Sequence, residues 1–115
     1  MNLEDYRTFC LSLKNVEETM PFDKTTLVFS IMGKMFILTN LETFEFINVK
    51  CEPEKAILFR EKYNAVTPGY YMNKKHWNSI KMDGSISDGL IKEWIEDSYN
   101  LVVAKLPKKV QKELE

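Results

Sequence analysis

Residues that support metal or nucleophilic chemistry are scarce in this chain. It has one histidine, His76, and two cysteines, Cys10 and Cys51, which lie far apart in the sequence. A zinc site needs several convergent Cys, His or carboxylate ligands, and a catalytic thiol or hydroxyl needs a base beside it. The 4 glycines are dispersed and form no phosphate-binding loop. We therefore expect no metal, no cofactor and no enzymatic activity.

Long apolar segments and an excess of one charge are also absent. No run of residues is apolar over the length of a membrane span, and Glu4 and Asp5 follow the start, which is unlike a signal peptide. Two thiols without a secretory signal are typical of a reduced compartment, so the sequence predicts a cytoplasmic protein that does not bind membranes. With 16 basic and 17 acidic residues the net charge is −1. Any affinity for DNA must therefore come from a local patch.

The composition is that of one ordinary globular domain. The chain has 115 residues, of which 44% are hydrophobic and 29% charged. A chain of this length can bury roughly two-thirds of its unfolded surface, which is enough for a single core. We expect one domain over residues 1–115.

Hydrophobic periodicity predicts a mixed α+β fold. Apolar residues recur every three or four positions in three stretches, and they alternate with polar residues in others. The expected helices cover residues 3–13, 53–64 and 88–105, and the expected strands cover residues 25–31, 35–39, 44–51, 70–72 and 77–82. Residues 15–24 lack a period and are expected to be irregular, and Lys108, Lys109 and Lys112 belong to a short tail after Pro107. The resulting order is α-β-β-β-α-β-β-α, a two-layer sandwich in which a three-strand meander and a hairpin form a mostly antiparallel sheet.

The hairpin is the most informative stretch of the sequence. Between Thr67 and Met82 there are three lysines and the only histidine, but no acidic residue. Tyr70, Tyr71 and Trp77 flank this basic turn, although aromatic residues in strands most often belong to a core. A basic loop beside aromatic rings is what a nucleic-acid contact requires.

The same stretch resembles a known family. The run Gly69-Tyr70-Tyr71-Met72-Asn73-Lys74-Lys75-His76-Trp77, followed by Asp83-Gly84-Ser85-Ile86 and by Ser98-Tyr99-Asn100-Leu101-Val102-Val103, is similar to the signature of the MmcQ/YjbR-like family of small bacterial proteins. Met20-Pro21-Phe22, Val28-Phe29 and Gly33-Lys34-Met35-Phe36 have the same order as other landmarks of that family. The resemblance implies a compact fold likened to secretion-chaperone and frataxin-like folds. It also implies DNA binding by a double-wing arrangement, and it brings no catalytic residues.

Two functional hypotheses follow. In the first, the chain binds double-stranded DNA through two basic reversals, one near Gly33-Lys34 and one at residues 73–76. The candidate contact residues are Lys34, Asn73, Lys74, Lys75, His76, Trp77 and Lys81. In a simpler interpretation His76 hydrogen-bonds the backbone and fixes the turn. In the second hypothesis an exposed sheet face binds a protein partner or a second copy of the chain, as a chaperone-like adaptor would.

Overall fold

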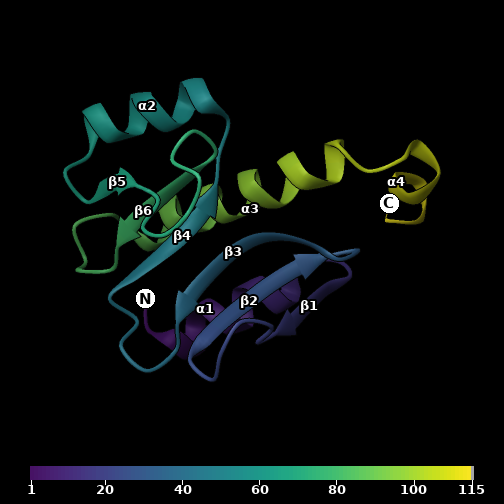
Figure 1. Ribbon diagram of the computed structural model, residues 1–115, viewed down its shortest axis with the longest axis horizontal. Coiled ribbons are helices and arrows are strands. Elements are labelled where there is room, and N and C mark those ends of the chain that lie inside the picture. The colour runs from purple at the N-terminus through teal and green to yellow at the C-terminus, as the bar shows by residue number, and fades with distance from the viewer. Residues whose placement is uncertain (115) are drawn as a thin grey trace.

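The computed structural model describes residues 1–114 and contains one six-stranded sheet with helices (Figure 1). The helices are α1 (Leu3–Ser12), α2 (Pro53–Lys62), α3 (Asp88–Ala104) and α4 (Lys108–Glu113). The strands are β1 (Val16–Thr19), β2 (Thr26–Ile31), β3 (Lys34–Asn40), β4 (Phe46–Lys50), β5 (Val66–Pro68) and β6 (Trp77–Lys81). All neighbouring strands are antiparallel, in the order β1-β2-β3-β4-β6-β5. The predicted α+β class and its central β2-β3-β4 meander are confirmed.

Local sequence signals fix the starts of the three main helices. Asn2 caps α1, since its Oδ1 accepts a hydrogen bond from the backbone N–H of Asp5 at 2.8 Å. Ser87 caps α3 in the same way through the N–H of Leu90 at 3.2 Å. Pro53 occupies the first turn of α2, where its missing N–H would have no partner.

The helices leave one face of the sheet open. The main core lies between the sheet and helices α1 and α3, and includes fully buried Tyr6, Phe29, Phe36 and Ile95. Figure 1 shows α1 and α3 behind the strands, with α2 beside the β5–β6 edge. On the opposite face a smaller cluster is formed by Val28, Leu38 and Trp77 together with Met35 and Met72. We call this opposite side the open face.

The first strand corrects the prediction of an irregular segment at residues 15–24. β1 pairs with β2 from Val16↔Ile31 to Thr19↔Val28. As an edge strand β1 is half exposed, so it lacks the apolar alternation of a buried strand. Glu18 is held by a two-point contact with the Arg7 guanidinium, at 2.7 and 2.9 Å. Tertiary pairing therefore forms this strand.

Residues 70–72 are also not a strand, contrary to the prediction. β5 ends at Pro68, and Gly69 makes the last ladder bond from its N–H to the Trp77 carbonyl at 2.9 Å. A side chain at position 69 would place its Cβ 2.7 Å from the Trp77 Cβ, so only glycine fits. Tyr71 then adopts a left-handed φ of 58°. The chain folds back over the open face, and we call residues 69–76 the covering loop.

Candidate nucleic-acid interface

Three cross-strand pairs organise the open face between β4 and β6. Residues directly opposite each other in an antiparallel pair project from the same side of the sheet. The pairs are Phe46↔Lys81, Asn48↔Ser79 and Lys50↔Trp77. In the middle pair the Ser79 hydroxyl donates a hydrogen bond to the side-chain oxygen Oδ1 of Asn48. Each outer pair places a lysine beside an aromatic ring.

The Asn48–Ser79 pair holds the covering loop onto the sheet. The backbone N–H of Tyr70 donates to Ser79 Oγ at 2.9 Å, and Asn48 Nδ2 donates to the Tyr70 carbonyl at 3.4 Å. Both side chains are nearly fully buried, at 4% exposure. Buried polar groups of this kind need partners, and here the loop backbone supplies them.

Lys34, Lys50 and Lys105 converge at one end of the sheet. Strand register places the start of β3, the end of β4 and the start of β6 at this end, because Ile37 pairs with Val49 and Lys50 with Trp77. Ser98 Oγ, from α3, donates to the Lys50 carbonyl at 2.5 Å and so fixes α3 against this strand end. Partial burial, followed by the charges of Lys105 and Lys34, lowers the pKa of Lys50. We call these three lysines the cationic end.

The predicted contact residues of the turn lie next to the cationic end. The backbone N–H of Cys51 donates to the His76 carbonyl at 2.8 Å, which joins the turn to the end of β4. Asn73 Oδ1 accepts from the N–H of Lys75 at 2.9 Å and shapes the turn. Lys74 Nζ donates to the Gly69 carbonyl at 3.0 Å, so this ammonium group also closes the covering loop. Lys75 is exposed, and so is Lys81, but Lys81 lies at the opposite end of β6 from the cationic end.

Trp77 is in a different position from the one its predicted role requires. Its side chain is 5% exposed and packs on the open face with Val28 and Leu38, beneath Met72. A ring buried in this way cannot stack on a base, so the structure removes Trp77 from the candidate contact residues. It supports the covering loop from below.

Arg60 holds the candidate site together, a role that sequence reasoning missed. From α2 its Nε donates to Asn78 Oδ1 at 2.6 Å, and its terminal nitrogen donates to the carbonyls of Lys74 and Trp77. Asn78 is 1% exposed and also donates from Nδ2 to the Ala56 carbonyl at 3.2 Å. One guanidinium thereby binds the covering loop, β6 and α2 together. The sequence offered only a basic residue in an amphipathic helix as a signal.

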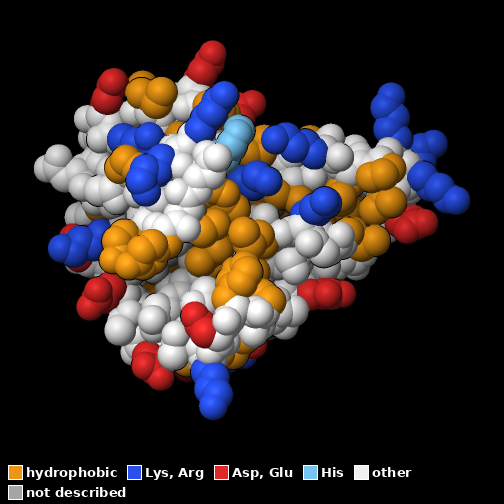
Figure 2. All heavy atoms as spheres, in the orientation of Figure 1, with side chains coloured by type: hydrophobic (Ala, Val, Ile, Leu, Met, Phe, Trp, Pro, Cys, Tyr) orange, Lys and Arg blue, Asp and Glu red, His pale blue; other side chains and the backbone are white. Residues whose placement is uncertain are grey.

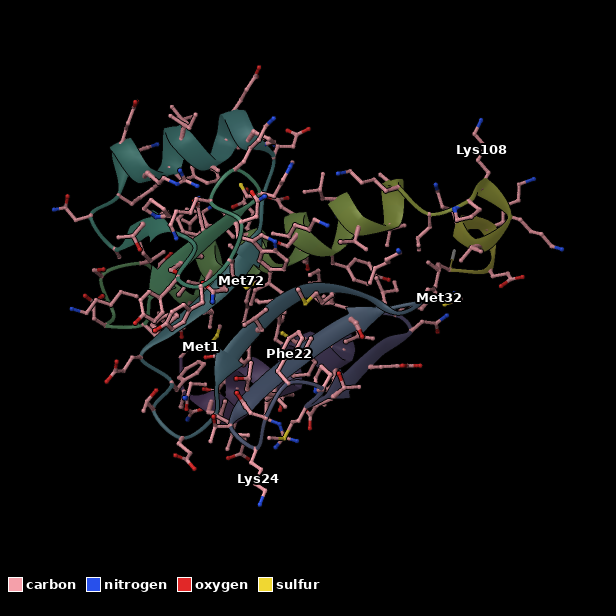
Figure 3. All side chains as sticks on the ribbon, viewed as in Figure 1. Met1, Phe22, Lys24, Met32, Met72 and Lys108 are labelled. Carbon is pink, nitrogen blue, oxygen red and sulfur yellow. The ribbon has the colours of Figure 1, made fainter. Side chains whose placement is uncertain are left out.

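Aromatic side chains line a groove on the open face beside the covering loop. The groove has a volume of about 530 Å³, and Figure 3 shows two of its residues, Phe22 and Met72, on the face that carries no helix. We define the aromatic groove by its large apolar side chains, Phe22, Phe46, Tyr70, Tyr71 and Met72. The Tyr70 ring lies 4.2 Å from that of Tyr71 and 5.7 Å from that of Phe46, measured between centroids. The neighbouring Tyr71 hydroxyl raises the pKa of Tyr70.

Direct ion pairs do not involve the lysines of this surface. Within residues 1–114 the two ion pairs are Arg7–Glu18 and the N-terminal amine with Asp88, and neither includes a lysine. Lys81 does interact with a carboxylate at longer range, since its charge is one of the causes that lower the pKa of Asp83. Figure 2 shows Lys and Arg side chains gathered around the chain's one histidine, next to an apolar patch. Lys108 lies apart from them at the far end of the molecule, on α4 (Figure 3). The predicted lysine group from 105 to 112 is thus divided between two places.

Replacing Lys50 by methionine is expected to raise the melting temperature at low ionic strength. The lowered pKa means that the folded protein holds the Lys50 proton less tightly than the unfolded chain. The charged form of Lys50 therefore lowers the free energy of unfolding at neutral pH. The free energy of unfolding rises with pH as Lys50 loses its proton in the folded protein, and this rise ends at about pH 10.4, where the unfolded chain loses the same proton. Methionine keeps most of the stem without the charge. Thermal melts at low and high salt test this prediction. The increase in melting temperature should become smaller at high salt, because salt screens the repulsion between Lys50 and the neighbouring lysines. A variant that melts at a lower temperature than the wild type at low salt would contradict it.

Both cysteine thiols are held in their neutral form by burial. Burial raises the pKa of the Cys10 thiol far above its ordinary value, and burial also raises that of Cys51. Cys51 lines a cleft of about 280 Å³ between α2 and α3, with Lys55 and Asp97 nearby. In the part of the chain that the structure describes, no three His, Cys, Asp or Glu side chains are grouped as metal ligands would be. Among the same residues no helix has the length and apolar character needed to cross a membrane.

Comparison with known proteins identifies the family. The family model named YjbR matches residues 11–101. The chain is 43% identical to the uncharacterized protein YbdF of Escherichia coli O157:H7, over 95% of this chain and 90% of the relative, and 26% identical to the uncharacterized protein YjbR of E. coli K12, over 97% and 96%. The crystal structure of Deinococcus radiodurans protein DR2400, with a domain named DUF419, has a TM-score of 0.91 and 35% identity, covering 98% of this chain and 87% of that one. The chain therefore belongs to the YjbR family, as its sequence signature predicted.

Proposed function

We propose that this protein binds DNA through the phosphate backbone at its cationic end. The observation that carries the proposal is the convergence of Lys34, Lys50 and Lys105, where partial burial and then the charges of Lys105 and Lys34 lower the pKa of Lys50. Lys34 stands at the β2–β3 reversal, and Lys75 at the turn before β6. These two reversals serve as the wings of the double-wing arrangement.

Phosphate is the partner that best suits this cluster. Three ammonium groups that repel one another gain most from an anion placed between them, and no carboxylate contributes to the pKa shift of Lys50. Phosphate contacts give affinity and orientation without sequence information. With a net charge of −1 the chain has no long-range attraction for DNA, so binding is weak and non-specific. The proposed role is binding, without a chemical step.

Fluorescence anisotropy with a labelled duplex tests the proposal. The apparent Kd should rise steeply with KCl, with a slope of about −0.9 in log affinity per phosphate contact, or about −3 for three contacts. A flat salt dependence, or no binding at high micromolar protein in low salt, would contradict it.

A protein-binding role for the open face is the second candidate. Large apolar side chains lie exposed there, with Phe22 at 63% and Tyr71 at 87% exposure. Such exposure is typical of surfaces that a partner segment or a second copy of the chain covers. Light scattering after size exclusion at rising concentration tests for self-association, and a pull-down from lysate tests for a protein partner, each with Phe22→Ser as the variant. A protein that is a monomer at all concentrations and retains no protein from lysate would count against this role.

A further inference from the structure

Tyr71 combines two features that cost stability. It is a non-glycine residue in the left-handed region, with a φ of 58°, and its side chain is 87% exposed. A left-handed conformation is unfavourable for a residue with a Cβ, and an exposed ring gains little stability from burial to offset it. Backbone strain that is not offset by local packing is often found in segments that bind ligands.

The aromatic groove is continuous with the lysines of the open face. Phe46, which lines the groove, lies directly across from exposed Lys81, and Lys50 lies four residues further along β4 beside the covering loop. At about 3.3 Å per strand residue, the two lysines are separated by about 13 Å along the sheet. Glu45 is the one charged side chain among those that line the groove, and the two lysines flank the groove without lining it. The aromatic side chains therefore lie between two flanking lysines on the β4–β6 pair.

We propose that the aromatic groove stacks unpaired bases, so that the protein prefers single-stranded nucleic acid to duplex. This rests on the proposed phosphate contacts at the cationic end. Every unpaired base offers a flat π face to an exposed ring, whereas the bases of a duplex are already stacked on one another. Tyr71 presents the most exposed ring, and Tyr70 and Phe46 line the groove beside it. The lysines near both ends favour a polyanion over an apolar peptide in this groove.

Anisotropy with a labelled oligothymidylate and a labelled hairpin duplex of equal phosphate number tests the preference. The wild-type protein should bind the single strand about tenfold more tightly, in line with stacking of one or two bases. Tyr71→Gly should remove about tenfold of the single-strand affinity and leave duplex affinity unchanged. Glycine adopts a left-handed φ freely, so this variant should keep or raise the melting temperature. Tyr71→Phe, which retains the ring, is the matched control and should bind as the wild type does.

The possible outcomes separate this inference from the proposed function. Equal affinity for both oligonucleotides, or an equal loss for both in Tyr71→Gly, would overturn the stacking role while duplex binding remained. If neither oligonucleotide binds, and Tyr71→Gly instead abolishes self-association, both proposals fall and the groove is a protein interface. If a stably folded Tyr71→Gly protein loses affinity for the single strand and keeps its affinity for the duplex, the result supports the inference.

Discussion

Replacing Lys34, Lys50 and Lys105 together by glutamate is expected to lower duplex affinity by more than about a hundredfold at low salt. The three ammonium groups act on one site, since Lys34 and Lys105 both shift the pKa of Lys50. Reversal turns the predicted phosphate contacts into repulsion. The salt slope of any residual binding should fall toward zero, because the released counterions belong to these contacts. Anisotropy titrations at two KCl concentrations measure both quantities.

A matched charge reversal elsewhere is the control for that experiment. Lys24, Lys62 and Lys92 are exposed. The Lys62 ammonium group lies over the Tyr63 ring, and that of Lys92 lies over the Phe9 ring. Their replacement by glutamate changes the net charge by the same amount. Affinity should fall only slightly, because a distant exposed charge is screened. Equal losses in the two triple variants would mean that overall charge, and not the cationic end, governs binding.

Replacing Arg60 by methionine is expected to destabilise the protein by about 3 kcal/mol and to release the covering loop. The guanidinium donates to Asn78 Oδ1 at 2.6 Å and to the carbonyls of Lys74 and Trp77. Asn78 is 1% exposed, so the loss leaves a buried acceptor without its partner. The melting temperature should fall by about 10 °C or more.

Trypsin supplies a second measurement of the released loop. Cleavage after Lys74 or Lys75 should become faster in the Arg60→Met protein, because Lys74 loses its backbone contact with α2. Lys62→Met, on the same helix but exposed, should melt and cleave as the wild type does. Arg60→Lys should resemble Arg60→Met, since an ammonium group cannot reproduce the planar fork. An Arg60→Met protein with unchanged melting and cleavage would show that Trp77 packing and the hydrogen bonds of Asn48 and Ser79 hold the loop without Arg60.

The sequence by itself determined the three main helices, the β2-β3-β4 meander and the family. These depend on short-range signals, such as Asn2 and Ser87 as caps, Pro53 in a first turn and the two-residue spacing of Leu27, Phe29 and Ile31. It also singled out the basic turn at residues 73–76. Strand β1 and the covering loop escaped prediction because an edge strand and a loop bound by side chains carry no hydrophobic period of their own.

Only the tertiary structure decided which of the basic and aromatic side chains share a surface. Lys34, Lys50 and Lys105 belong to three separate elements, and strand register together with the docking of α3 brings them to one end of the sheet. The same pairing buries Trp77 and leaves Tyr71 exposed, although both are aromatic residues of one predicted hairpin. Side-chain direction in a sheet follows from pairing between distant segments, and composition and periodicity contain no record of that pairing.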